Sequence, residues 1–178
     1  TRSPGSTLKP FIYAKALQRN LITPDEIFED TAVQVAGYAP DNFDQTFSGQ
    51  VGLEEALARS LNIPAITTLE RLNPDVFEHE LRNFLDGQIS HNKSSGLSLA
   101  VGGFYMSAED LVQLYLEFAN PGEAGRLVFN EAITRKNREF LFEQASARTI
   151  QDLLIQHDRI GKKSAFKTGT SHNRQDAW

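Results

Sequence analysis

Short apolar patterns of helical period, separated by proline and glycine, run through most of this 178-residue chain. The first pattern follows the breaker cluster Ser3-Pro4-Gly5 and continues to about residue 20. Pro10 is tolerated only in the first turn of a helix, where its missing N–H would be unpaired, so this helix cannot begin much before Ser6. The sequence therefore predicts an α-rich fold with Ser6 in the opening turn of its first helix.

Further helices are predicted from the same periodicity and from the residues that cap or break it. The residue before Pro64 is pushed out of the α region, so one helix should end at Ile63 and another begin at Pro64. Asn73-Pro74 has the form of a helix start, and Ser107 with Asp110 forms an approximate capping box. The predicted helices cover residues 53–63, 64–72, 74–87, 107–120 and a last one around 150–154.

Strand signals are few. Residues 25–52 are rich in turn formers and suit an irregular connection with a short strand at 31–35, and polar and glycine residues prevail over 88–103. The clearer strand, 165–170, lies eight residues before Trp178, without the strands that would pair with it. We therefore expect residues 1–178 to be part of one domain that lacks strands before Ser6 and after Trp178. In the isolated chain, 165–178 should exchange amide hydrogens faster than Leu8 to Leu17.

Composition removes several classes of function. Eighteen basic and 23 acidic residues give a net charge of -5, which is the wrong sign for binding nucleic acid through phosphates. No apolar run approaches the ~20 residues of a membrane span, and the first residues do not resemble a signal peptide, so any membrane anchor should lie outside this segment. The absence of cysteine excludes a disulfide scaffold, a thiol nucleophile and a cysteine-ligated metal, but leaves the compartment open.

Two of three short motifs are individually weak. Ser6-Thr7-Leu8-Lys9 places a hydroxyl and an amine on one helix face, where a lysine can take a proton from a serine. About 0.5 such S-x-x-K matches are expected by chance, and 90–93 and 164–167 match too, but only Ser6 opens an apolar helix behind a Pro-Gly turn. Ser60-Leu61-Asn62 is a common pattern too, also matched at 171–173, but it falls where one predicted helix ends and Pro64 starts the next, so its polar groups could be exposed on a turn.

Lys167-Thr168-Gly169 is the discriminating motif, with about 0.03 matches expected by chance, and Thr170 extends it. A lysine supplies positive charge, Gly169 allows a ligand backbone to approach, and two threonine hydroxyls can bind a carboxylate. This segment therefore suits an anionic peptide end. The four histidines show no metal-ligand spacing and are assigned no chemistry.

S-x-x-K, S-x-N and K-T-G in this order form the motif set of penicillin-binding proteins and class A β-lactamases. The longer strings RSPGSTLKPFIYA, YAPDNFDQTFSGQVGLEEALARSLNIPAI, GLSLAVGGFYMSAEDLVQLYLEFAN and KTGTSHNRQDAW resemble the transpeptidase domain of bifunctional, class A penicillin-binding proteins. The first and last strings lean toward the penicillin-binding protein 1C branch. The resemblance implies a mixed α/β fold of the β-lactamase and transpeptidase type, mostly helical here, with the K-T-G strand at its C-terminal end.

The resemblance also implies a mechanism: Ser6 attacks a D-Ala-D-Ala stem peptide or a β-lactam and forms an acyl-enzyme. Lys9 would be the base and Ser60 would relay a proton to the leaving amine. Asn62 would hold the substrate amide, while Lys167, Thr168 and Thr170 would fix its carboxylate beside Gly169. The N–H groups of Ser6 and Thr170 would form the oxyanion hole. For Lys9 to act as a base its pKa must fall from ~10.4, which burial and the nearby Lys167 cation would both promote.

The resemblance implies no cofactor and no metal, an extracytoplasmic (periplasmic) location, and a parent chain with an anchor and a glycosyltransferase segment. Its expected partners are peptidoglycan stem peptides and β-lactams. Leu61 stands where class A β-lactamases carry aspartate, and their E-x-x-L-N motif is missing, so efficient β-lactam hydrolysis is not expected. A non-catalytic penicillin-binding sensor or scaffold and a D,D-carboxypeptidase remain alternative hypotheses, and activity of the segment alone is in doubt.

Overall fold

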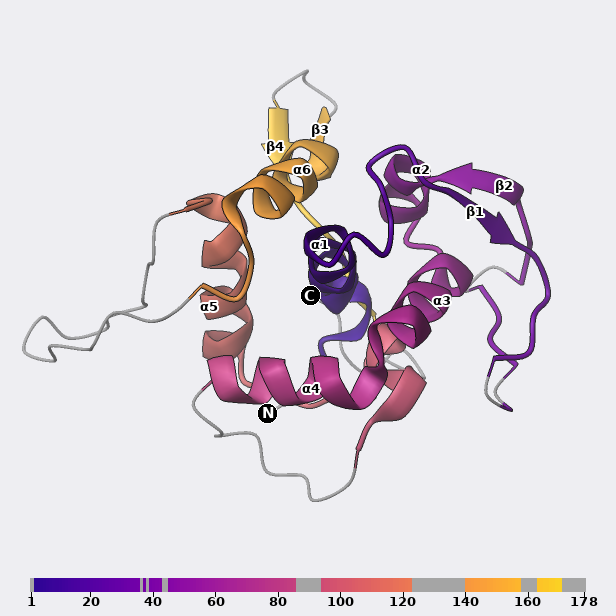
Figure 1. Cartoon of the computed structure of the whole chain (residues 1–178), viewed down its shortest axis with the longest axis horizontal. Coiled ribbons are helices and arrows are strands. Elements are labelled where there is room, and N and C mark those ends of the chain that lie inside the picture. Colours follow the sequence, from indigo (N-terminus) through magenta and orange to yellow (C-terminus); the bar gives the residue numbers. More distant parts are fainter. Residues whose placement is uncertain are drawn as a thin grey trace, which may run out of the picture.

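The structure is a computed structural model that describes residues 2–35, 37, 39–42, 45–85, 94–122, 140–157 and 163–170. Helix α1 (Lys9–Gln18) lies at the centre, preceded directly by the 3-10 turn η1 (Gly5–Leu8) (Figure 1). Around α1 lie α2 (Leu53–Ala58), α3 (Asn62–Leu72), α4 (Pro74–Phe84), α5 (Ala108–Ala119) and α6 (Gln144–Leu154). Ser6 lies in η1, the 3-10 turn that runs directly into α1, so the prediction that Ser6 lies in the opening helical turn is confirmed. Pro10 is the second residue of α1.

The strands of the described residues form two small antiparallel pairs. Strand β1 (Ile27–Asp30) pairs with β2 (Gly49–Gly52), and Asp30 lies opposite Gly49. Strand β3 (Ile155–His157) pairs with β4 (Lys163–Ala165), and Ile155 lies opposite Ala165. An isolated bridge joins Arg2 to Met106. The predicted mixed α/β, mainly helical fold is confirmed.

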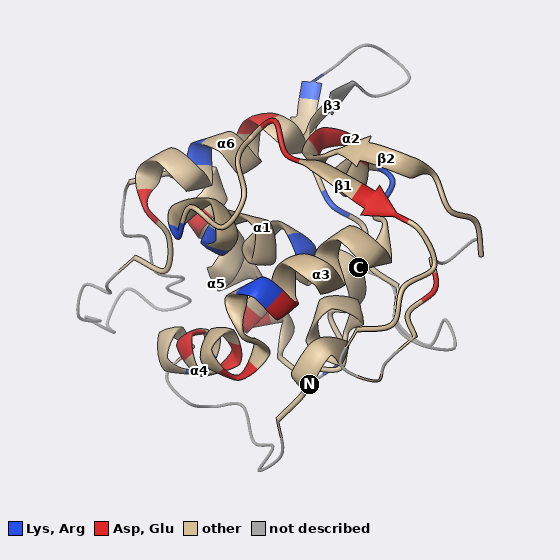
Figure 2. Cartoon of the chain, turned by 45° about the vertical axis from the view of Figure 1, so that its right-hand side comes forward, with Lys and Arg blue, Asp and Glu red and all other residues tan. Residues whose placement is uncertain are grey.

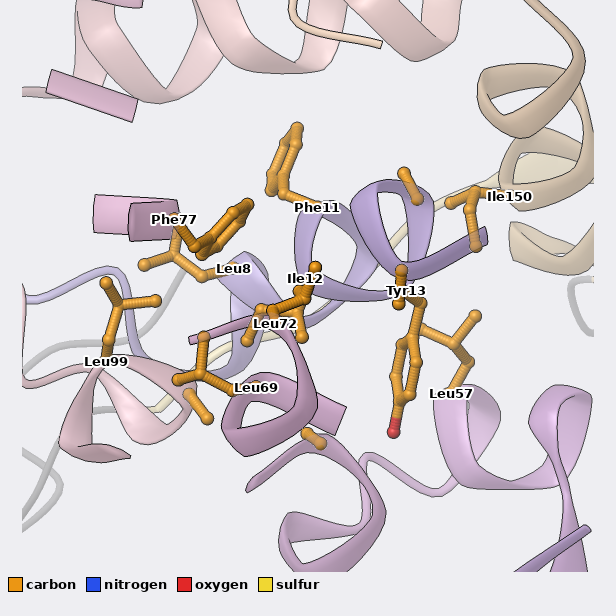
Figure 3. Packing of buried hydrophobic residues seen from close by; sticks show 14 of the residues in the cluster. Leu8, Phe11, Ile12, Tyr13, Leu57, Leu69, Leu72, Phe77, Leu99 and Ile150 are labelled. Carbon is orange, nitrogen blue, oxygen red and sulfur yellow. The ribbon is translucent and has the colours of Figure 1, made fainter. Parts of the chain in front are cut away.

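Helix α1 is surrounded by apolar side chains. Eight of its residues, Lys9 to Ala16, are buried, and it contacts α3, α6, η1 and the second 3-10 turn, η2 (Gly96–Val101). Figure 3 shows residues of α1 between side chains of α3, α4 and α6. On the α5 side, the rings of Phe11, Phe118 and Phe142 stack with centroids 4.8 to 5.9 Å apart. A helix that is buried on every side holds its first residues in a fixed place.

Charged residues lie mostly on the outer elements. Figure 2 shows acidic and basic residues on most of the described elements, and α3 carries one of each, Glu70 and Arg71, side by side near its end. In the described part of the chain, no helix is both long enough and apolar enough to cross a membrane.

Several predicted helix starts are confirmed. The Asn73 side chain accepts hydrogen bonds from the N–H groups of Asp75 and Val76, and Ser107 with Asp110 forms the predicted capping box of α5. The end predicted for α4, Gly87, is wrong, because the helix ends at Phe84 and Leu85 is already its C-cap.

The prediction of one helix over 53–63 is wrong. Helix α2 ends at Ala58, and α3 begins at Asn62, two residues before Pro64. The chain breaks at Ser60, which adopts a left-handed φ of 59°. Pro64 is then the third residue of α3, where its absent N–H has no intrahelical partner to lose, so the first turn accepts Ile63 in a helical conformation.

Both predicted strands are displaced. The strand predicted at 31–35 lies at Ile27–Asp30, because that segment pairs with the unpredicted strand β2. The strand predicted at 165–170 ends at Ala165, where the pairing with β3 stops, and K-T-G follows it as an irregular segment. The loop predicted over 88–103 contains η2 in its described part.

Candidate active site

Residues from three separate parts of the chain meet at the start of α1. Ser6 lies within η1 and is half-buried, and Lys9 opens α1 and is fully buried. The Lys9 N–H donates to the Ser6 carbonyl, which closes the turn between them. Residues three apart in such a turn lie on the same side, so the serine and the lysine face one way.

Two glycines allow the K-T-G segment to lie directly on this turn. A Cβ on Gly5, which has a φ of +56°, would lie 2.6 Å from the Thr170 carbonyl oxygen. A Cβ on Gly169 would lie 2.5 Å from the Pro4 carbonyl oxygen and 2.7 Å from the Thr7 methyl group. Only residues without a side chain permit this approach. Ser6 is therefore bracketed by residues in contact with Gly169 and Thr170.

The other side of the turn rests on residues that the sequence did not single out. Ser3 Oγ donates to the Gly102 carbonyl at 2.6 Å, and a Cβ on Gly102 would lie 2.7 Å from the Gly5 Cα. Tyr115 Oη donates to the Thr7 carbonyl at 2.9 Å. Gly102 and Tyr115 are both about 100 residues from this turn in the sequence. Neither a glycine nor a tyrosine in an apolar helix carries a local sequence signal for such contacts.

The turn between α2 and α3 supplies the second group of polar side chains. Leu61 is extended and buried in the core, whereas its neighbours Ser60 and Asn62 are half-buried. Ser60 lies on the turn between α2 and α3, as predicted, but Asn62 is the first residue of α3, and both residues are half-buried rather than exposed.

Both lysines reach Ser60. Lys9 Nζ donates to the Ser60 carbonyl at 2.5 Å and to Asn62 Oδ1 at 2.7 Å, and lies 3.5 Å from Ser60 Oγ. Lys167 Nζ donates to Ser60 Oγ at 2.8 Å and to the Thr168 carbonyl at 2.8 Å. The Ser60 hydroxyl thus lies between two amines from opposite ends of the chain.

Burial makes both amines weaker bases, and the Lys167 cation adds to the effect on Lys9. Burial, and secondarily the Lys167 cation, lower the pKa of Lys9 well below its ordinary value. Burial lowers the pKa of Lys167 to about 8. Both causes that the sequence predicted for Lys9 are present, and a neutral lysine can accept a proton.

Of the predicted site residues, Ser6, Lys9, Ser60, Asn62 and Lys167 to Thr170 all lie in this one region. Thr168 and Thr170 are exposed beside the buried Gly169. Of the competing motif matches, Ser164 is exposed on β4, whereas 90–93 and 171–173 lie outside the described residues.

No cluster of potential metal ligands occurs in the segments that the structure describes. Of the four histidines, His79 contacts Asn83 on α4. His91, His172 and the side chain of His157 lie outside the described part of the chain.

Two buried residues next to this region were missed as site residues. Asp30 is fully buried and Asn42 is 3% exposed, and both lie in a hydrogen-bonded network that ends at Asn62. Apolar periodicity carries no information on them, because their importance comes from contacts between distant loops.

The profile of the penicillin binding protein transpeptidase domain matches residues 1–176. The chain therefore belongs to this family. It is 36% identical over 185 residues to penicillin-binding protein 1C of Escherichia coli (strain K12), with 99% of this chain aligned to 24% of that protein. It is 27% identical to penicillin-binding protein 1F of Bacillus subtilis (strain 168), over 96% of this chain and 25% of that protein. It is 26% identical to penicillin-binding protein 1A of Neisseria meningitidis, over 99% and 26%.

The chain thus spans about a quarter of the length of these relatives. The predicted family is confirmed, and a penicillin-binding protein 1C is among the relatives, at 36% identity. A solved structure described as a peptidoglycan glycosyltransferase from Burkholderia ambifaria superposes with a TM-score of 0.73, covering 97% of this chain and 64% of that chain, at 16% sequence identity. At that identity the likeness concerns the fold.

Proposed function

We propose that this domain is a serine D,D-transpeptidase that cross-links peptidoglycan stem peptides through an acyl-enzyme on Ser6 and is acylated by β-lactams. The observation that carries the proposal is the pair of contacts around Ser60, with Lys9 on one side and Lys167 on the other, beside a turn in contact with Gly169 and Thr170. A nucleophile, a weakened base, a proton relay and a carboxylate-binding cation are then available within one region.

In the first half of the reaction, neutral Lys9 takes the Ser6 hydroxyl proton while Oγ bonds to the carbonyl carbon of the penultimate D-alanine. The N–H groups of Ser6 and Thr170 stabilise the oxyanion, and each such donor is worth ~10²–10³ in rate. The C–N bond then breaks, and the leaving D-alanine takes a proton that passes from Lys9 through Ser60. Lys167, Thr168 and Thr170 bind the carboxylate of the leaving residue, while Asn62 holds the substrate amide.

In the second half, the amine of another stem peptide attacks the Ser6 ester carbon. Its surplus proton returns through Ser60 and Lys9 to the Ser6 oxygen as the C–O bond breaks. A new amide and free Ser6 result, and Lys9 is again neutral. With water in place of the amine the same steps would make the domain a D,D-carboxypeptidase.

The proposed partners are stem peptides ending in D-Ala-D-Ala and β-lactam antibiotics, and no cofactor takes part in the steps above. We further propose that the domain works outside the cytoplasm, where peptidoglycan is assembled, in a parent chain that carries an anchor and a glycosyltransferase segment. Membership of the penicillin binding protein transpeptidase family supports these proposals. The relatives are themselves named penicillin-binding proteins, which supports binding of β-lactams.

Labelling by a fluorescent penicillin tests the nucleophile. We expect Ser6→Ala to abolish covalent labelling in the full-length protein, while Ser164→Ala and Ser90→Ala leave it intact. Labelling that persists in Ser6→Ala contradicts the assignment.

Release of D-alanine from a stem-peptide mimic separates an enzyme from a non-catalytic sensor, because both would be labelled but only the enzyme turns over. Adding an acceptor amine then separates transfer from hydrolysis. A cross-linked product supports the transpeptidase, and free tetrapeptide alone indicates the carboxypeptidase.

A further inference from the structure

A buried carboxylate lies at one end of a chain of hydrogen bonds that leads to Lys9. Asp30, the last residue of β1, is fully buried, and its two oxygens accept from Asn42 Nδ2 at 2.7 and 3.0 Å. Oδ2 also accepts from the Ser48 N–H at 2.9 Å. Because an ionised carboxylate can only accept hydrogen bonds, it determines which end of the Asn42 amide faces it.

The orientation of Asn42 passes to the start of α3. Asn42 Nδ2 donates to Asp30 and also, at 2.9 Å, to the Thr46 carbonyl. Asn42 Oδ1 therefore lies on the other side of the amide. There Oδ1 accepts from the Asn62 N–H at 2.8 Å. That N–H is one of the first in α3 and has no partner within the helix, so Asn42 fixes the place where the helix begins.

The same loop fixes the Asn62 side chain. Asn62 Nδ2 donates to the carbonyl of Asp41, the residue next to Asn42, at 2.7 Å. The amide oxygen of Asn62 therefore faces the other way, where it accepts from Lys9 Nζ at 2.7 Å. The carboxylate thus sets the Asn42 amide, and the loop that Asn42 holds in place sets the Asn62 amide through the Asp41 carbonyl.

The direction of the Asn62 amide matters because a neutral amine has two N–H groups and one lone pair. The two closest acceptors of Lys9 Nζ are the Ser60 carbonyl oxygen and Asn62 Oδ1, so both N–H groups are engaged by acceptors and the lone pair stays available for Ser6. If the amide were reversed, its NH₂ group would face Lys9 and compete for the lone pair that must receive the Ser6 proton.

We propose that Asp30 and Asn42 are positioning residues for the proposed reaction, which hold the Asn62 amide oxygen toward Lys9 so that the lysine lone pair remains free for Ser6. The inference rests on the proposed function of Ser6 and Lys9. It adds two residues that contact neither the substrate nor the reacting atoms. Their effect reaches the site only through Asn62.

The test measures acylation by a fluorescent penicillin in the full-length protein, with the acylation rate constant separated from the dissociation constant of the initial complex. Asp30→Asn keeps the size of the side chain but removes the acceptor-only group, and Asn42→Ala removes the link. We expect each to lower the acylation rate constant at least tenfold, while the initial dissociation constant changes less than threefold, because positioning acts on the proton transfer.

A titration of Lys9 provides the readout that a loss of stability alone would not move. Asn62 Oδ1 stabilises the Lys9 ammonium, so turning it away should lower the pKa of Lys9 still further. Lys167 faces Lys9 in every variant and is unchanged. We therefore expect the Lys9 pKa, followed by NMR of the labelled side chain, to fall in both variants although acylation becomes slower. A larger fraction of neutral Lys9 together with a lower acylation rate constant indicates that the orientation of Lys9 is lost. A change in the basicity of Lys9 alone would not produce that combination.

Thr68→Val is the matched control, because Thr68 is fully buried on the same helix and its hydroxyl bonds to the Pro64 carbonyl outside this network. It should lose stability without changing the acylation rate constant or the Lys9 pKa. If Asn42→Ala does not fold, the isosteric Asp30→Asn decides. Acylation within twofold of wild type and an unchanged Lys9 pKa in a folded variant overturn the proposal. A wild-type protein that is not acylated on Ser6 overturns the proposed function instead, and the Lys9 titration still decides whether the network reaches Lys9.

Discussion

Replacing Gly169 by alanine should separate the K-T-G segment from the turn η1 that contains Ser6. The new Cβ would lie 2.5 Å from the Pro4 carbonyl oxygen, 2.7 Å from the Thr7 methyl group and 2.8 Å from the Thr7 nitrogen. Two of these three atoms belong to the backbone and cannot rotate away. The φ of Gly169 lies outside the left-handed region, so the contacts alone cause the effect.

The required movement gives the expected magnitude. Ordinary contacts begin near 3.4 Å, so the turn and the segment must move apart by about 0.9 Å. Overpacking of this kind costs about 1–3 kcal/mol of stability. The larger effect is on the reaction, because a displacement of about 1 Å between reacting groups costs about 10²-fold in rate. We therefore expect the acylation rate constant to fall about 100-fold.

Stopped-flow acylation with a fluorescent penicillin measures this rate constant, and a thermal melt measures stability. Gly52→Ala is the matched control, because a Cβ on Gly52 meets no atom within 4 Å and its φ is -77°. It should acylate like the wild type. Adding Thr7→Ser to Gly169→Ala should rescue little, because it removes the methyl contact and leaves both backbone contacts in place. Acylation of Gly169→Ala within threefold of wild type would refute the packing argument.

Three further predictions concern the lysines and the core. Lys167→Arg should move the alkaline limb of the acylation profile upward: the pKa of Lys167 is about 8, so the wild type loses this cation above that pH, whereas arginine stays charged. A pH–rate profile with the same alkaline limb in both proteins would contradict the role of Lys167. Lys9→Ala should slow acylation by at least 10²-fold and weaken initial binding far less, because a base acts in the transition state; equal losses in single-turnover kinetics would argue against it. Phe11→Ala should lower the free energy of unfolding in urea by about 3–5 kcal/mol, because Phe11 is fully buried against three aromatic rings.

The local sequence determined the elements whose causes are local. Periodicity and caps identified the helices, because Pro10, Asn73 and the Ser107–Asp110 box act within one turn of where they stand. The motifs likewise identified the residues of the candidate site, because the hydroxyls and amines that the chemistry needs are named by the sequence itself. The sequence did not predict the bounds of strands, because a strand ends where its pairing with a neighbouring strand ends. The strands Ile27–Asp30 and Lys163–Ala165 are examples.

Only the tertiary structure decided how the motifs combine. Ser60 takes a left-handed conformation that shortens α2 and turns its carbonyl toward Lys9, and Gly5 and Gly169 allow two backbones to touch across more than 160 residues of sequence. The buried Asp30 carboxylate accepts from the Asn42 amide, Asn42 accepts from the Asn62 N–H, and the Asn62 amide donates to the Asp41 carbonyl. These features come from hydrogen bonds and close packing between distant segments. A local sequence motif cannot predict these contacts, because each contact depends on where the fold places the segment on its other side.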